Sequence, residues 1–152
     1  MNCDSLRVGA CQFEEDDRPR RSKSGLTPLI EVFDMPTSVA FYRDVIGFEV
    51  VMQSSPGDSF DWGLLRMGDA ELMLNTAYDA DERPAAPDPA RWAGHPHATL
   101  FFFCPDLDEA YEHLRSKGIA VEKPVVRHYG MRQLSVTDPD GYGLCFPYPA
   151  KK

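Results

Sequence analysis

The stretch VFDMPTSVAFYRDVIGFE, residues 32–49, has a counterpart in CPDLDEAYEHLRSKGIAVE, residues 104–122. Each holds the end of an apolar strand, an Asp that caps a helix, an amphipathic helix, a Gly that ends it and the start of another strand. A second matching pair follows, LLRMGDAELML at 64–74 and LSVTDPDGYGLCF at 134–146. The two copies lie about 70 residues apart, which is longer than the repeat length of solenoid proteins. The spacing therefore predicts two half-domain modules that share one concave site.

The composition is that of a globular chain that fits one compact domain. Of its 152 residues, 43% are hydrophobic and 26% are charged, which are ordinary fractions. No apolar run approaches the roughly 18–20 residues of a membrane span, and the N-terminus lacks the apolar core of a secretory signal. The four cysteines show no metal-binding spacing. We therefore expect a cytoplasmic protein with no membrane partner.

The net charge of −8 argues against nucleic acid as a partner, because binding it requires neutralisation of phosphates. Residues 1–24 contribute nothing to this charge, since their five acids offset their five bases. The acidic excess therefore lies on the duplicated part of the chain. It favours a cationic ligand, with ordinary solubility as the alternative explanation.

The chain divides into a tail and two modules. Residues 1–24 lack periodicity and predict a disordered or loosely attached tail. Residues 26–77 form the first βαβββ module, and residues 96–148 form the second. The connection between them, 78–95, is rich in Ala, Pro and Asp. The predicted fold class is α+β, with each helix covering one face of an antiparallel sheet, so that a curved sheet surrounds a cleft.

Within the modules, apolar periodicity predicts helices at about 36–45 and 107–116. The second module should open with a strand from about His97 to Cys104. Further short strands are expected near 120–122 and 125–128. If His95 and His97 both lie in the opening strand, their side chains point to one face of the sheet.

Two motifs in order resemble those of the vicinal oxygen chelate superfamily, which includes glyoxalase I, extradiol dioxygenases, fosfomycin resistance transferases and bleomycin resistance proteins. The first is Asp34-x-x-x-Ser38-x-x-Phe41-Tyr42-x-x-x-x-Gly47-Phe48, and the second is Asp138-Pro139-Asp140-Gly141-Tyr142. The similarity covers residues 26–148. It implies the duplicated fold predicted above, but a fold alone does not decide function.

In the metal-dependent members of this superfamily, a divalent ion is bound by His, Glu or Gln from both modules. The corresponding positions here are Thr27, Met73, Thr99 and Cys145, and a two-residue shift would bring His97 to the third. This set suits a hard cation poorly. We therefore expect no cofactor and disfavour a divalent metal. The alternative is a metal-dependent lyase or dioxygenase with displaced ligands, drawn from His95, His97 and His128.

The metal-free bleomycin-resistance branch is the more similar one. Pro28 stands six residues before Asp34, and Gly130-Met131-Arg132 leads into the penultimate strand, as in that branch. The resemblance implies a homodimer in which both subunits build each groove. The predicted function is binding of a small aromatic or cationic molecule in a cleft, with no metal catalysis.

Five residues are candidates for ligand binding. They are Phe60, Trp62, Trp92, Tyr129 and Arg132. Phe60 and Trp62 lie on a strand that should border the cleft and can stack on a planar or cationic ligand, although packing against a helix is the alternative. Trp92 fits the cleft, a dimer interface or the chain's own core equally well. Tyr129 and Arg132 lie near a loop that often reaches the ligand in the family, but Arg132 can instead pair with an acid.

Overall fold

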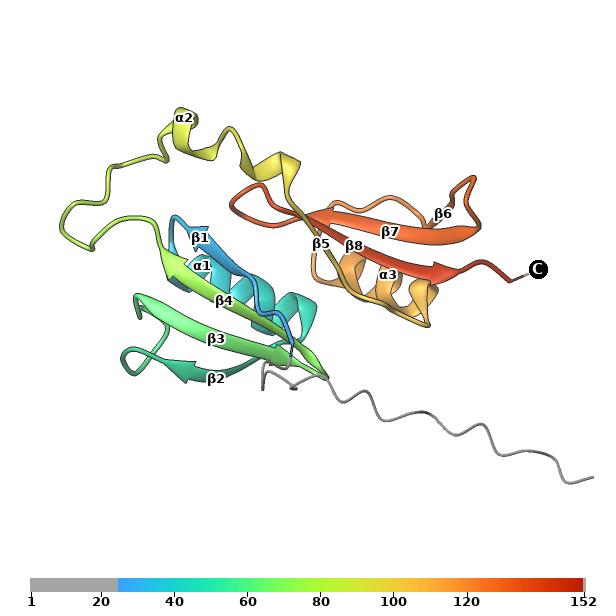
Figure 1. Cartoon of the computed structure of the whole chain (residues 1–152), viewed down its shortest axis with the longest axis horizontal. Coiled ribbons are helices and arrows are strands. Elements are labelled where there is room, and N and C mark those ends of the chain that lie inside the picture. The colour runs from blue at the N-terminus through green and yellow to red at the C-terminus, as the bar shows by residue number, and fades with distance from the viewer. Residues whose placement is uncertain (1–24, 152) are drawn as a thin grey trace, which may run out of the picture.

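A computed structural model describes residues 25–151 and shows two four-stranded mixed sheets side by side (Figure 1). The first has the order β1-β4-β3-β2, and its strands are Leu29–Val32 (β1), Glu49–Gln53 (β2), Trp62–Met67 (β3) and Ala70–Thr76 (β4). The second has the order β5-β8-β7-β6, and its strands are Thr99–Phe101 (β5), Val125–Val126 (β6), Met131–Thr137 (β7) and Gly143–Pro149 (β8). The predicted α+β class with two βαβββ modules is confirmed. The predicted tail lies outside the described residues.

Both sheets differ from the expected antiparallel arrangement in one respect. The edge strands β1 and β5 run parallel to β4 and β8, respectively, whereas the other pairs are antiparallel. The reason lies in the connection from each edge strand, which passes through a helix before the chain returns to the sheet.

Each module has one main helix, which begins at a capping Asp. Asp34 accepts a hydrogen bond from the backbone N–H of Thr37 and precedes α1 (Met35–Ala40), which continues as a π-helix, η1 (Phe41–Ile46). Asp106 caps α3 (Leu107–Ser116) in the same way. Gly47 follows Asp34 by 13 positions and Gly118 follows Asp106 by 12. The wider π turn accommodates the extra residue of the first module.

The helices cover one side of the sheets and share a single hydrophobic core. Strand alternation turns Leu65 of β3 and Leu72 of β4 toward this core, where both are at most 1% exposed. In the second module, Leu134 and Leu144 belong to the same core cluster. Side chains at the intervening positions lie on the opposite side of each sheet, which we call its open face.

Strand register shows that the two modules are equivalent position by position. Leu29 pairs with Met73 between β1 and β4, and Phe101 pairs with Cys145 between β5 and β8. Leu65 pairs with Leu72, and Val136 pairs with Leu144. Consequently, Met67 and Ala70 at the β3–β4 hairpin correspond to Asp138 and Tyr142 at the β7–β8 turn.

The turn of residues 138–142 joins the modules through buried polar groups. Asp140, only 5% exposed, accepts hydrogen bonds from the Phe33 backbone N–H at 2.8 Å, from Ser38 Oγ at 2.9 Å and from Trp92 Nε1 at 3.4 Å. The Tyr42 hydroxyl donates to Asp138 at 2.7 Å. Burial raises the pKa of Asp138, because the charged carboxylate is less well solvated there.

The start of the second module differs from the sequence prediction. Residues His95–His97 form a short 3-10 helix (η2), and β5 covers only Thr99–Phe101. The strand expected from His97 to Cys104 is therefore too long at both ends. Two tertiary hydrogen bonds fix His95 before the sheet begins, one from Nδ1 to the Asp140 carbonyl at 2.8 Å and one between Nε2 and the Tyr142 hydroxyl at 3.1 Å.

Other secondary-structure predictions need smaller corrections. Residues 120–122 form no strand, and β6 is confined to Val125–Val126 rather than 125–128. Pro124, which has no N–H to donate to a ladder, separates the two segments. The connection between modules contains a short helix, α2 (Pro89–Trp92). Among the residues described, no helix is long and apolar enough to cross a membrane.

Candidate functional site

The four positions that correspond to metal ligands in the family lie at or beside the open faces. In the first module, the Thr27 hydroxyl donates to Glu71 Oε2 at 3.1 Å, and Met73 lies between Leu29 and Leu64 on the neighbouring strands. In the second module, Thr99 pairs with Gly143, and Cys145 is 4% exposed. The register makes Thr27 and Met73 equivalent to Thr99 and Cys145.

These side chains do not fit a hard divalent cation. They offer two hydroxyls, a thioether and a thiol, whereas such an ion takes carboxylate, imidazole and water ligands. Within residues 25–151, no group of three or more His, Cys, Asp or Glu side chains is placed to hold a metal ion together. These four positions therefore do not form a site for such an ion.

The histidines do not gather as the sequence suggested. His95 and His97 lie in η2 instead of a strand, so the expectation that both point to one face of the sheet is wrong. His95 is 8% exposed and both of its ring nitrogens are hydrogen-bonded, whereas His97 is exposed. His128 packs against Tyr129 in the turn between β6 and β7.

The open face of the first sheet carries a row of apolar side chains across all four strands. From edge to edge, the paired positions are Leu29, Met73, Leu64 and Met52. Trp62 is half-buried and lies two positions from Leu64 on the same face, directly opposite Asn75. A planar molecule can lie on this apolar row and stack against the Trp62 ring beside it.

Carboxylates border this apolar row but are already paired. Arg66 contacts Glu71 at 2.7 Å, and Arg91 contacts Glu31 at 3.0 Å. The hydrogen bond from Arg66, together with one from Thr27, lowers the pKa of Glu71. The acidic charge on this face is therefore largely compensated, which favours an aromatic over a strongly cationic ligand.

Phe60 and Trp92 pack within their own chain. Phe60 is 1% exposed, and a Cβ added to Gly63 would approach its ring to 2.5 Å. Phe60 also lines a small pocket of about 180 Å³ together with Phe33 and Tyr78. The Trp92 ring is parallel to that of Tyr78 and makes an edge contact with Phe33. Trp92 thus makes contacts within its own chain, and its roles at a cleft or a dimer interface stay predictions.

Tyr129 and Arg132 lie apart from the first sheet. Tyr129 is 56% exposed in the turn before β7. Arg132 forms two hydrogen bonds with Asp108 of α3, at 2.6 and 2.9 Å, so its side chain is directed to the helix side of the sheet. The five predicted residues thus do not form one pocket, and Trp62 is the one that borders the apolar row.

Sequence reasoning missed the larger of the two pockets described here. It has a volume of about 940 Å³ and lies between the two modules, beside the β3–β4 hairpin and the start of α3. Two small residues, Ala70 and Ala110, line it where the equivalent positions of the other module hold Tyr142 and Ser38. Aligning the two halves of the chain would have revealed this difference.

Solved structures share the fold at low sequence identity. TioX from Micromonospora sp. ML1 is 17% identical with a TM-score of 0.65, over 84% of this chain and 99% of its own. A bleomycin resistance determinant encoded on transposon Tn5 is 23% identical with a TM-score of 0.62, over 84% and 98%. Lactoylglutathione lyase from Agrobacterium tumefaciens is 21% identical with a TM-score of 0.58, over 84% and 95%. These similarities show the fold alone.

No curated protein matches the chain significantly. A family model does match, however, over residues 27–146, which include nearly all of both modules and both motifs quoted above. The chain therefore belongs to the Glyoxalase/Bleomycin resistance protein/Dioxygenase superfamily.

Proposed function

We propose that this protein binds a small aromatic or cationic molecule in a groove over the open faces of its sheets, without metal catalysis. The observation that carries the proposal is the apolar row bordered by Trp62, in which Met73 occupies one of the family's metal-ligand positions. Stacking and burial of apolar area supply the affinity, and no bond needs to be made or broken. A bleomycin resistance determinant among the structures of the same fold is consistent with this use.

We further propose that a second copy of the chain closes the groove. Large apolar side chains on the open faces remain exposed in one chain: Leu29 at 50%, Met52 at 58%, Phe101 at 59% and Val125 at 46%. Such patches commonly mark an interaction surface. A symmetric homodimer would cover these side chains and place open faces of both subunits around one ligand.

A thermal-shift screen with a panel of aromatic and cationic drugs tests the binding proposal, because a ligand that binds the folded state raises the melting temperature. Each compound is measured with and without divalent metals and at low and high salt. Trp62→Ala should weaken the best ligand by about tenfold, since a buried aromatic contact is lost. A matched control is Trp92→Phe, which leaves the apolar row intact.

Two results would overturn the proposal. The first is stoichiometric Zn, Ni, Fe or Mn in protein purified without chelators and its loss in His97→Ala, which would establish a metal site. The second is ligand affinity that changes neither with Trp62→Ala nor with salt. Sedimentation of the unliganded protein tests the dimer, and a monomer at micromolar concentration would contradict it.

A further inference from the structure

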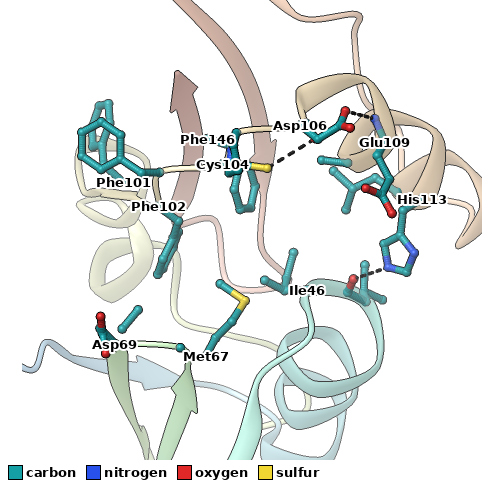
Figure 2. Close-up of a pocket in the computed structure, with 17 residues that line it drawn as sticks. Ile46, Met67, Asp69, Phe101, Phe102, Cys104, Asp106, Glu109, His113 and Phe146 are labelled. Atoms are coloured by element: carbon teal, nitrogen blue, oxygen red, sulfur yellow. Dashed lines mark hydrogen bonds between the residues drawn. The ribbon is translucent and has the colours of Figure 1, made fainter. Parts of the chain in front are cut away.

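The modules meet at two equivalent places. In the closed junction, the turn of residues 138–142 packs against β1 and the start of α1. In the open junction, the β3–β4 hairpin of residues 67–70 faces the end of β5 and the start of α3, and the pocket of about 940 Å³ lies between them (Figure 2). The equivalence follows from strand register, because Met67 and Ala70 stand where Asp138 and Tyr142 stand.

Differences in side-chain size between equivalent positions of the two modules account for the pocket at the open junction. At the closed junction, the Tyr142 ring stacks on His95 at 4.1 Å, and Ser38 binds Asp140. At the open junction, Ala70 replaces the equivalent of Tyr142, and the hairpin has one residue fewer than the turn. Ala110 of α3 replaces the equivalent of Ser38. The two junctions thus have equivalent backbones, but the open junction lacks the larger side chains that occupy the closed one.

The walls of the pocket are mainly apolar and come from both modules. Figure 2 shows Phe102 directed toward Met67, with Ile46 on one side and Phe146 above. Leu114 and Ala110 add the inner face of α3. A volume of this size is in the range of sites that hold drug-sized molecules. The volume and the apolar lining suit an aromatic skeleton of several rings.

The ionisable side chains of the pocket are acidic apart from His113, whose Nε2–H donates to the Val45 carbonyl at 2.9 Å. Asp69, Asp106 and Glu109 line it, and the lining contains neither Lys nor Arg. Within residues 25–151, no basic side chain lies in ion-pair contact with Asp69 or Glu109. This differs from the open face of the first sheet, where arginines compensate Glu31 and Glu71. The open junction therefore keeps uncompensated negative charge beside an apolar cavity.

Glu109 stands where its charge is available to a ligand. It is the third residue after the capping Asp106, and its backbone N–H donates to that carboxylate at 2.9 Å. In a full capping box, the Glu109 carboxylate would also accept a hydrogen bond from the Asp106 backbone N–H. No such bond is present, and the side chain instead projects beside His113 at the edge of the pocket (Figure 2).

We propose that the open junction is a second binding site, for a polycyclic aromatic cation whose rings lie against Phe102 and Met67 and whose ammonium group faces Glu109. Trp62 and Met73, which belong to the groove proposed above, do not line this site, whereas Phe101 borders both. Charge complementarity decides the ligand class, since an anionic compound of the same size would meet three carboxylates and neither Lys nor Arg.

Methionine-methyl NMR separates the two sites, because Met67 lines the open junction whereas Met73 lies on the open face of the first sheet. The protein is titrated with anthracenylmethylamine, which is cationic at neutral pH, and with anthracenemethanol and anthracenecarboxylate as matched neutral and anionic compounds. The amine should shift the Met67 signal, whereas a shift of the Met73 signal reports binding in the groove and is followed as a separate titration. The alcohol should bind about two- to fivefold more weakly, as expected for loss of a partly exposed ion pair, and the carboxylate more weakly again.

Variants of α3 locate the interaction. Glu109→Gln should weaken the amine about two- to fivefold and leave the alcohol unchanged. Glu112→Gln, an exposed position of the same helix outside the pocket, is the matched control and should change neither. Ala110→Trp should fill the cavity and reduce the affinity of both compounds more than tenfold. Trp62→Ala should leave the Met67 titration unchanged, so that failure of the groove proposal is distinguishable from failure of this one.

Three results would overturn the proposal. The Met67 signal could remain unchanged at saturating amine, or shift equally with amine and carboxylate. Alternatively, it could change with protein concentration alone and not with the amine, which would identify a second copy of the chain as the occupant. If Ala110→Trp fails to fold, Glu109→Gln and the three-compound series still decide the outcome.

Discussion

The closed and open junctions are the same structure built from two different sets of side chains. At the closed junction, Asp138, Asp140 and Tyr142 bind backbone and side-chain groups of the first module. At the open junction, Met67 and Ala70 leave a cavity at the equivalent place. The two backbone frames are equivalent, but only the closed junction is filled by hydrogen-bonded side chains, whereas the open junction contains a pocket.

The largest expected effect comes from removing the central acceptor of the closed junction. Asp140→Ala leaves three donors without their partner, on Phe33, Ser38 and Trp92. The free energy of unfolding should fall by about 3 kcal/mol, because buried unsatisfied groups are costly. Urea denaturation measures this loss. The matched change Asp69→Ala in the other hairpin should alter stability by about 0.5 kcal/mol or less, and equal losses would contradict the division between the two junctions.

A second substitution removes one hydroxyl from the closed junction. Tyr142→Phe keeps the ring on His95 but deprives His95 Nε2 and the Glu31 N–H of their hydrogen-bond partner. We expect a loss of about 1–2 kcal/mol in thermal or urea unfolding. Unchanged stability would show that water satisfies both groups and that the phenol is not needed to join the modules.

A reciprocal exchange tests a single helix position. Ser38→Ala removes a fully buried hydroxyl that donates to Asp140 and should cost about 1 kcal/mol. Ala110→Ser introduces the same hydroxyl at the equivalent position of α3, where the open junction admits water, and stability should stay within about 0.5 kcal/mol. If the two substitutions have equal effects, the helix positions are not as different as the structure shows.

The smallest expected effect concerns pH. Because burial raises the pKa of Asp138 above its ordinary 3.8, the folded protein retains a proton that the unfolded chain has released. The free energy of unfolding should therefore fall as pH rises from 3.8 through the folded pKa. Asp138→Asn should lack this decline.

Asp108 provides the matched control for this pH effect. Its hydrogen bond with Arg132 lowers its pKa, so its contribution to stability is present above pH 3.8 and is lost as the pH falls through the folded pKa. Asp108→Asn should remove this opposite dependence. Parallel curves for the wild type and Asp138→Asn, measured by urea denaturation at each pH, would refute the assigned role of Asp138.

Local sequence patterns predicted the skeleton of the fold well. Capping Asp34 and Asp106, terminal Gly47 and Gly118 and the alternation of buried residues gave both helices and the order of the strands. The patterns failed where distant contacts decide the backbone. The strand expected from His97 begins only at Thr99, because Asp140 and Tyr142 bind the ring of His95 from more than 40 residues away and residues 95–97 form a 3-10 helix.

The candidate site was harder to predict than the fold. Trp62 has the open-face position expected from strand alternation, but alternation cannot foresee that Arg132 pairs with Asp108 or that Trp92 stacks on Tyr78. The pocket escaped detection for another reason. It exists because Ala70 and Ala110 are smaller than the residues at the equivalent positions of the other module. A small residue such as Ala is not part of a recognisable sequence motif.

The closed junction also has a kinetic consequence. Its hydrogen bonds join residues 96 to 107 positions apart in the chain, whereas the β3–β4 hairpin pairs immediate neighbours. Because distant contacts require the closure of a long loop, we expect each module to gain structure early and the junction to form after the rate-limiting step. Weakening the junction should then accelerate unfolding and hardly slow refolding. The contacts made by the turn of residues 138–142 would thus determine the unfolding rate, and with it the lifetime of the folded protein.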